Sequence, residues 1–364
     1  MFTFTQKKKG RRMLTITEIA KKAGVSIGTV DRVLHNRGRV AQETEDKVKA
    51  VIEEFGYQPD PLARHLKKHS QYKIGVLFPS LASGSGYWNK VFDGAERYMK
   101  TDLSAFSFSL VPFFFERNDD ESLSKAFSAM TNSPCAAYVI APVMQEKMCE
   151  LLLNAKELKP YCLVDTSITA FESDENQLNK PLSVIAQNPY RAGFLAGKLT
   201  ELLGGRGGTY IALEIYGGAY NLNERSRGFC AWFQGRKECN AVHSVLEVFD
   251  NDRKDEIIRN SLAELFSRHS DVAGICTVSV EVQLVADYIA QHGIAGVAVT
   301  GFDLIDENER LLREEKIHCL IDQEPEEQGK IALHTLFRHL VFNEVPQSKI
   351  DIPIDIYFKE NLQP

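Results

Sequence analysis

The feature that most constrains the fold is a regular alternation of strand-like and helix-like segments from Tyr72 to Gly301. Short apolar runs such as KIGVLFPS, which are typical of buried strands, alternate with longer helix-like segments such as 190–203. Strands that alternate with helices form parallel sheets with helices on both faces. The alternation runs in two series, the first ending at Val164 and the second beginning at Leu182. The sequence therefore predicts an α/β body of two similar lobes with a cleft between them.

A different pattern occupies residues 13–58. Thr15 and Glu18 form a capping-box pair, so a first helix is expected from about Ile16. Gly24 permits a tight turn, and Ser26 is the expected N-cap of a second helix. A third helix is expected at Glu43–Phe55, and the residues expected to face inward from the three helices are Ile19, Ala20, Ala23, Val30, Val33, Leu34, Val48, Val51, Ile52 and Phe55. Two short helices joined by a turn are a helix-turn-helix, so the sequence predicts an all-α DNA-binding head.

The residues left outside this small core are the ones available to contact DNA. On the second helix they are Ser26, Ile27, Gly28, Thr29, Asp31 and Arg32. A recognition helix uses its N-terminal residues on base edges in the major groove, and Arg32 can donate two hydrogen bonds to a guanine. Ser26 and Thr29 can reach phosphates. Thr15, at the start of the first helix, and His35, after the second, complete the expected DNA contacts.

The charge distribution supports a nucleic-acid partner for the head. Residues 1–70 carry 15 Lys or Arg and 8 Asp or Glu, whereas the remainder carries 28 and 41. A basic head on an acidic body indicates that the head meets a polyanion and the body does not. Residues 1–12 form a basic tail that lacks the apolar stretch of a secretory signal.

The cysteines indicate a reducing environment. Seven of them are scattered along the chain without the paired spacing of metal sites, so we expect free thiols, no metal and no cofactor. No apolar run approaches the ~18 residues that a membrane span needs. We therefore expect a cytoplasmic protein.

Residues 14–66, LTITEIAKKAGVSIGTVDRVLHNRGRVAQETEDKVKAVIEEFGYQPDPLARHL, closely resemble the head of the lactose-repressor (LacI/GalR) family of regulators. The resemblance implies that a hinge at 59–70 folds when two subunits meet on DNA, with Leu66 wedged into the minor groove beside Ala63. It also implies a homodimer on a near-palindromic operator. Asp31 stands where the family usually has Ser, and His35 begins an altered turn, so no operator sequence is carried over.

Residues 71–364 resemble the periplasmic sugar-binding proteins of the ribose-binding type, which form the usual effector domain of that family. The motifs that carry the resemblance are YWNKVFDGA, LVDTS, NPYRAGFLAG, NERSRGF, VTGFD and IDQEPEEQGKIAL. The resemblance implies that the chain crosses between the lobes three times. The first lobe is expected at about 71–186 and 323–345, and the second at about 187–322 and 346–364.

Sheets of this kind bind ligands at the carboxyl ends of their strands, and these strand ends together with the motifs of the resemblance select the candidate effector residues. They are Tyr87, Trp88, Asp165, Thr166, Arg225, Ser279, Asp303 and Gln323, with Tyr216 and Tyr220 as weaker candidates. The aromatic rings are expected to stack on a sugar, Arg225 to donate a fork of hydrogen bonds, and the carboxylates to accept from hydroxyls. Thr166 and Ser279 replace an Arg and an Asn of the ribose-binding type, which leaves the sugar open.

A head, a hinge and a cleft in one chain predict a transcription regulator, expected to be a repressor, whose operator affinity is controlled by a small molecule. A sugar is the expected effector, and a nucleobase or another metabolite is the alternative. An exported binding protein of a transporter is disfavoured by the head. An enzyme is the other rival, because Asp165 and Asp303 could do acid–base work. The chain has no nucleophile elbow and no Walker A loop, since GGRGG at 204–208 follows a helix, so we expect no enzymatic activity.

Overall fold

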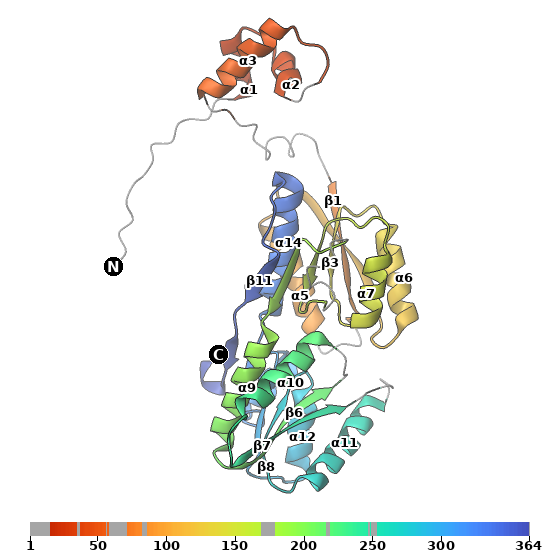
Figure 1. The fold of residues 1–364 in the computed structure, drawn as a ribbon, viewed down its shortest axis with the longest axis vertical. Helices are drawn as coiled ribbons and strands as arrows, with labels where there is room; N and C mark the ends of the chain where they lie inside the picture. The colour runs from red at the N-terminus through yellow and green to blue at the C-terminus, as the bar shows by residue number, and fades with distance from the viewer. Residues whose placement is uncertain are drawn as a thin grey trace, which may run out of the picture. The chain divides into compact units, whose positions relative to one another are not determined.

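The computed structural model divides into two compact units, Met1–His69 and Ser70–Pro364 (Figure 1). It describes residues 15–34, 37–55, 57, 71–81, 86–168, 179–215, 219–246, 248 and 253–363. The basic tail at 1–12 and the expected hinge at 59–70, with its Ala63 and Leu66, lie outside the described residues. His35 and Tyr216 lie outside them as well.

The head contains three described helices, α1 (Ile16–Ala23), α2 (Ile27–Leu34) and α3 (Gln42–Phe55). The predicted capping box is confirmed, because the Glu18 amide donates to Thr15 Oγ1 over 3.3 Å and the Thr15 amide donates to Glu18 Oε2 over 2.7 Å. Gly24 ends α1 with a φ of 67°, the left-handed conformation that glycine adopts without strain. The capping box fixes where α1 begins, and Gly24 ends α1 with the turn that leads into α2.

The core of the head is small and apolar. Ile19, Ala20, Val30, Val33 and Val48 are buried, and most of the other residues expected inside are half-buried against them. Phe55 was expected to face inward, and this prediction is wrong. The residue is 36% exposed, and the Lys22 ammonium lies 4.2 Å from the centroid of its ring. A cation over an aromatic face lets that ring remain at the surface.

The first lobe of the body is built on a parallel six-stranded sheet in the order β11-β5-β4-β3-β1-β2. Its strands are β1 (Gln71–Pro79), β2 (Ser107–Phe115), β3 (Ala137–Ile140), β4 (Tyr161–Val164), β5 (Ser183–Gln187) and β11 (Lys349–Ile352). The helices α5 (Tyr87–Thr101) and α14 (Pro325–Phe342) cover one face, and α6 (Asp120–Thr131) and α7 (Gln145–Asn154) cover the other. Alternate residues of β1 serve the two faces, with Val76 and Phe78 toward α5 and Leu77 toward α6.

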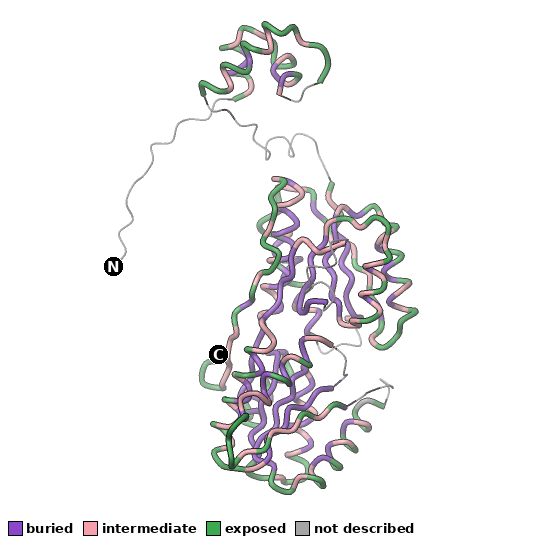
Figure 2. The backbone as a smooth tube through the Cα atoms, viewed as in Figure 1, coloured by how far each residue is buried: buried purple, intermediate pink, exposed green. Residues whose placement is uncertain are grey.

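The second lobe repeats this plan with the order β12-β10-β9-β8-β6-β7. Its strands are β6 (Gly208–Ile215), β7 (Cys239–Leu246), β8 (Val272–Thr277), β9 (Ala298–Phe302), β10 (Cys319–Asp322) and the antiparallel β12 (Asp355–Tyr357). The helices α9 (Pro189–Gly204) and α10 (Tyr220–Trp232) cover one face, and α11 (Lys254–Arg268), α12 (Val282–Gln291) and α13 (Asp306–Arg313) cover the other, while a short helix η2 (Lys359–Asn361) follows β12. The central strands of both sheets are buried, whereas the edge strands β2, β7, β11 and β12 and the outward faces of the helices are more exposed (Figure 2). The predicted fold class, a helical head and a two-lobed α/β body, is confirmed.

The chain passes between the two sheets three times, after β5, after β10 and after β11. The buried side chain of Gln187, at the end of β5, joins these three crossings. Its Nε2 donates to the carbonyl oxygens of Asp322 and Pro353, each over 2.9 Å. One amide group therefore holds together the three segments that connect the lobes.

One expected lobe assignment is wrong in part. The sequence predicts the segment 346–364 in the second lobe, but Lys349–Ile352 forms β11, which pairs with β5 at the edge of the first sheet. Ile352 is buried in the core of that lobe, and β11 covers backbone groups of β5 that would otherwise form an open edge. The third crossing therefore falls between Ile352 and Asp355.

Each lobe contains one very close helix crossing, between α9 and α10 in the second lobe and between α5 and α14 in the first. A Cβ atom at Gly193 would lie 1.9 Å from the Arg225 carbonyl oxygen, and one at Gly228 would lie 2.1 Å from the Tyr190 carbonyl oxygen. Gly94 and Gly329 make an equivalent reciprocal contact in the first lobe. Only glycine permits these approaches, and the first of them sets the position of Arg225.

We expect Gly193→Ala to lower the free energy of unfolding of the body by about 1–3 kcal/mol, because the added methyl group must push α10 away from α9. Denaturant unfolding followed by circular dichroism measures the change. Arg191→Ala, also at an exposed position of α9, is the matched control and should change the stability by less than about 0.5 kcal/mol. Equal stability of the two variants would show that the crossing adapts without cost.

Candidate functional site

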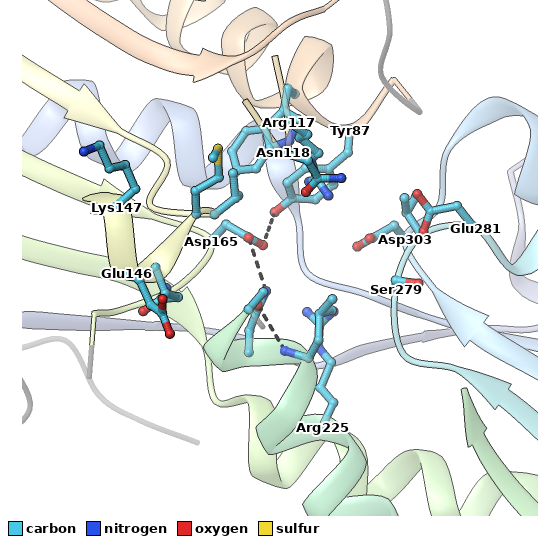
Figure 3. A pocket seen from close by; sticks show the side chains of 18 of the residues that line it. Tyr87, Arg117, Asn118, Glu146, Lys147, Asp165, Arg225, Ser279, Glu281 and Asp303 are labelled. Carbon is cyan, nitrogen blue, oxygen red and sulfur yellow. Dashed lines mark hydrogen bonds between the residues drawn. The ribbon is translucent and has the colours of Figure 1, made fainter. Parts of the chain in front are cut away.

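A cavity of about 460 Å³ lies between the two lobes of the body. Its lining residues follow strand ends: Asp165 comes after β4, Ser279 after β8, Asp303 after β9 and Gln323 after β10. Tyr87 and Trp88 begin α5, and Arg225 reaches the cavity from α10. The carboxyl ends of the parallel strands therefore bring side chains from both lobes to one place, as Figure 3 shows for the labelled residues.

Asp165 connects the two lobes across the cavity. Its Oδ1 accepts a hydrogen bond from Tyr87 Oη over 3.0 Å, and its Oδ2 accepts one from Asn221 Nδ2 over 3.2 Å. Its backbone has a φ of 72°, and its amide donates to Gln328 Oε1 over 2.8 Å. Burial raises the pKa of Asp165, while the Arg225 guanidinium acts in the opposite direction. This carboxylate is both a ligand-facing group and a contact between the lobes.

Arg225 is 2% exposed and is held on three sides. Its Nη1 donates to the Val278 carbonyl oxygen over 3.0 Å, its Nη2 donates to Gln323 Oε1 over 2.8 Å, and its guanidinium carbon lies 4.1 Å from the centroid of the Phe302 ring. A buried guanidinium needs partners of this kind, because isolated charge is expensive to remove from water. Arg225 is therefore fixed before any ligand arrives.

Asp303 faces the cavity from the second lobe, with a φ of 69°. Gln323 Nε2 donates to its Oδ1 over 2.8 Å, so Gln323 bridges Asp303 and Arg225. Burial raises the pKa of Asp303 to about 7, and the nearby Arg225 guanidinium opposes that rise. At neutral pH this group exists both as a carboxylic acid and as a carboxylate.

Several buried polar atoms of the cavity lining have no hydrogen-bond partner among the described residues. Three of them are Trp88 Nε1, Arg225 Nε and Ser279 Oγ. The Trp88 ring packs against Phe78 and Tyr87, with centroid distances of 5.2 and 5.0 Å, so its position is fixed by aromatic contacts. Buried polar atoms in native proteins are nearly always satisfied, so these three call for a polar ligand or water.

The structure brings together in this cavity all but one of the main effector residues expected from the sequence. The exception is Thr166, which is buried and lines a second cavity of about 120 Å³ together with the weaker candidate Tyr220. Neither residue lines the larger cavity, so their expected position is wrong. The backbone of Asp165 is left-handed, and the side chain of Thr166, which follows it, lines the smaller cavity.

Sequence reasoning did not identify Asn221 or the outer part of the cavity. Asn221 lies four residues before Arg225 on α10, hence one helical turn away on the same face, and that spacing would have identified it. The outer lining residues are Arg117, Asn118, Asp120, Gln145, Glu146, Lys147 and Glu150, and the buried Glu281 lines the cavity as well. They come from loops and helix starts, which carry no periodic signal.

On the head, the described residues among those expected to contact DNA lie on the accessible surface of α2 and at the start of α1 and α2. Ser26, Ile27, Gly28 and Arg32 are exposed or half-buried, and so are Thr29 and Asp31. The Thr29 amide donates to Ser26 Oγ over 3.1 Å, and Arg32 Nε donates to the Gly28 carbonyl oxygen over 3.2 Å. Thr15 is exposed, although its side chain takes part in the capping box.

Comparison with known proteins agrees with this division of the chain. Residues 15–60 match the family of bacterial regulatory proteins named after lacI, and residues 74–344 match the periplasmic binding protein domain. The ribose operon repressor of Halalkalibacterium halodurans is 24% identical over 355 residues, which cover 96% of this chain and 97% of that one. The regulator AscG of Escherichia coli is 41% identical over 85 residues, only 23% of this chain and 25% of its own length.

A solved structure shares the fold of the body. The crystal structure of a putative LacI transcriptional regulator from Bacteroides fragilis has a TM-score of 0.70 and 24% identity, and the match covers 80% of this chain and 98% of that one. The fold and the cavity define a DNA-binding regulator that carries a periplasmic-binding-protein-like domain. The chain belongs to the periplasmic binding protein domain family over residues 74–344, and residues 15–60 form a head of the lacI family of bacterial regulatory proteins.

Two features are absent from the part of the chain that the structure describes. No described helix combines the length and apolar character that crossing a membrane requires. Within the same part of the chain, no group of three or more His, Cys, Asp or Glu side chains is arranged to hold a metal ion.

We expect Asp303 to make stability depend on pH. Its folded pKa of about 7 lies above its ordinary value of 3.8, so its contribution to the free energy of unfolding decreases as the pH rises between these values. Asp303→Asn removes this titration. The stability of the variant relative to the wild type should therefore rise between about pH 4 and pH 7, by up to about 4 kcal/mol, and then stay constant.

Urea unfolding at a series of pH values measures this difference. Asp93→Asn, which replaces an exposed carboxyl on α5, is the control and should stay within about 0.5 kcal/mol of the wild type throughout. A pH-independent difference for Asp303→Asn would mean that the Asp303 pKa is not raised.

Proposed function

We propose that this DNA-binding regulator is controlled by a sugar that binds in the cavity between its lobes. The observation that carries the proposal is the combination of Trp88, two buried carboxylates and a fixed guanidinium in one cavity. Sugars present an apolar C–H face to aromatic rings and hydroxyls to charged acceptors and donors, which fits this lining. The relationship to a repressor named for a ribose operon supports the same effector class.

The proposed control acts through the contacts between the lobes. Besides the Asp165–Asn221 bond, Asn118 Nδ2 donates to the Val248 carbonyl oxygen over 3.1 Å, and Lys90 Nζ donates to the Leu304 carbonyl oxygen over 3.0 Å. A ligand that contacts both lobes favours the arrangement in which these bonds form. Such a ligand shifts the population of closed molecules in proportion to its preference for them.

The proposed DNA partner is a near-palindromic operator bound by a homodimer, with the chain acting as a repressor in the cytoplasm. The exposed residues of α2 read base edges in this proposal, and the residues from 59 to 70 form the hinge between the DNA-binding domain at 13–58 and the effector domain at 71–364. The chain is proposed to have no enzymatic activity. Turnover of any bound compound by the purified protein would contradict that part.

We expect Ser279→Ala to weaken sugar binding about 5- to 10-fold, because it removes one hydrogen-bonding group from the cavity. Its hydroxyl has no partner among the described residues, so folding should be unaffected. Isothermal titration with the sugar that gives the largest thermal stabilisation measures the loss. Ser183→Ala is the matched control, since Ser183 Oγ is also buried and unpartnered within the described part of the chain but does not line the cavity. Equal losses in both variants would place the sugar elsewhere.

We expect a saturating concentration of that sugar to change operator affinity about 5- to 150-fold, because effector and operator are coupled by ~1–3 kcal/mol. The operator is selected from random DNA by the purified protein, and affinity is followed by fluorescence anisotropy. Arg32→Ala is the control, since it should lose sequence-specific DNA binding while its affinity for the sugar stays unchanged. If operator affinity stays the same in the presence of every sugar that binds, the proposed control is refuted.

A further inference from the structure

The charges of the cavity restrict which sugars it accepts. We infer that the effector is an uncharged polyhydroxy compound and that the cavity excludes phosphate esters and sugar acids. The inference rests on the proposed function and adds the chemical class of the ligand to it. Three features of the cavity support it: its excess of carboxylates, the engagement of its cations, and its central pair of buried acids.

The lining of the cavity is acidic. Six of its residues are acidic, namely Asp120, Glu146, Glu150, Asp165, Glu281 and Asp303. Three are basic, namely Arg117, Lys147 and Arg225. A phosphate carries nearly two negative charges at neutral pH, so it would enter a site that already has an excess of like charge. Sites that recognise phosphates have the opposite character, with clustered cations or converging backbone amides.

The basic residues already have partners inside the protein. The buried Arg225 uses Nη1 and Nη2 on the Val278 carbonyl oxygen and on Gln323, which leaves only Nε for a ligand. Bidentate recognition of a phosphate or carboxylate needs two parallel N–H groups, which Arg225 does not offer. Lys147 Nζ lies 2.9 Å from Glu150 Oε2, and the charge of Arg117 acts on Asp165.

The two carboxyl groups at the centre of the cavity determine which charge a ligand can carry there. Asp165 and Asp303 are 7% and 4% exposed, and they face the cavity from opposite sides in Figure 3. Burial raises the pKa of both groups, which shows that the site already disfavours the negative charge it contains. A further buried anion would meet both groups, whereas hydroxyls donate to them and accept from Trp88 Nε1. A neutral polyol satisfies the cavity without adding charge.

The test compares matched pairs of compounds that differ only in a phosphate group. The panel holds D-ribose and ribose 5-phosphate, D-glucose and glucose 6-phosphate, D-fructose and fructose 1-phosphate, and adenosine and AMP, with gluconate as a sugar acid. Thermal shift identifies the ligands of the full-length protein, and isothermal titration measures their affinity. We expect the uncharged member of the binding pair to bind at least about 100-fold more tightly than its phosphate.

Asp303→Asn provides a second readout of charge selection. It removes one buried acid at constant shape, so the ratio between the affinities of the uncharged compound and its phosphate should fall at least about 10-fold. Asp93→Asn, which removes an exposed carboxyl group outside the cavity, should leave the ratio unchanged. A ratio that falls equally in both variants would overturn the inference.

The panel separates this inference from the proposed function. Tighter binding of a sugar phosphate or of gluconate overturns the charge inference but keeps a sugar effector. If adenosine binds but AMP and all the sugars do not, the proposal of a sugar effector is overturned and the charge inference is supported. Failure of every uncharged compound to bind counts against both.

Discussion

The body of this regulator depends on a buried guanidinium that must stay compensated. Arg225 is surrounded by Gln323, the Val278 carbonyl oxygen and the Phe302 ring, and it moderates the raised pKa values of Asp165 and Asp303. Such a cluster is costly if one member is lost, because the remaining buried charge has no partner. The surrounding helices and strand ends therefore have to hold it in one geometry, which the close glycine crossing of α9 and α10 accomplishes.

The cavity can be lined by two separate lobes because each lobe buries its strands without the other. Each lobe has its own apolar cores on both faces of its sheet, so neither needs the other to bury its strands. The groups that meet in the cavity are then free to be polar. The contacts between the lobes in this region are single hydrogen bonds and a small apolar contact, in which Ile305 of the second lobe is buried against the core of the first. A small, mostly polar interface suits two bodies that separate and rejoin.

Strand periodicity in the amino-acid sequence is enough to predict the two lobes, and the ends of the predicted strands select Asp165 and Asp303 as neighbours in one cavity. Ser279 is identified by the resemblance to the ribose-binding type. Thr166 shows the limit of this reasoning, since a left-handed backbone at Asp165 turns the next side chain away and no periodicity reports such a turn. Asn221 and the outer lining escape prediction for a related reason, because side chains from helices and loops meet only in three dimensions.

The C-terminal segment lies partly in the lobe opposite to the predicted one, although its pattern is readable. Residues 350–356 alternate isoleucine with polar residues or proline, which is the signature of strands interrupted at Pro353. Which sheet each strand joins depends on where an open edge is available. That is a property of the folded lobe and not of the local sequence.

Gln187 has a consequence for how such a regulator can diversify. Its amide group joins all three crossings, so the ease with which the lobes separate depends in part on one side chain that lines neither the 460 Å³ cavity nor the surface of α2. When only a fraction of the molecules has the lobe arrangement that binds the ligand, the apparent affinity is reduced by that fraction. Substitutions at this position would therefore reset the concentration at which a gene responds, while the identity of the signal and of the gene stay the same.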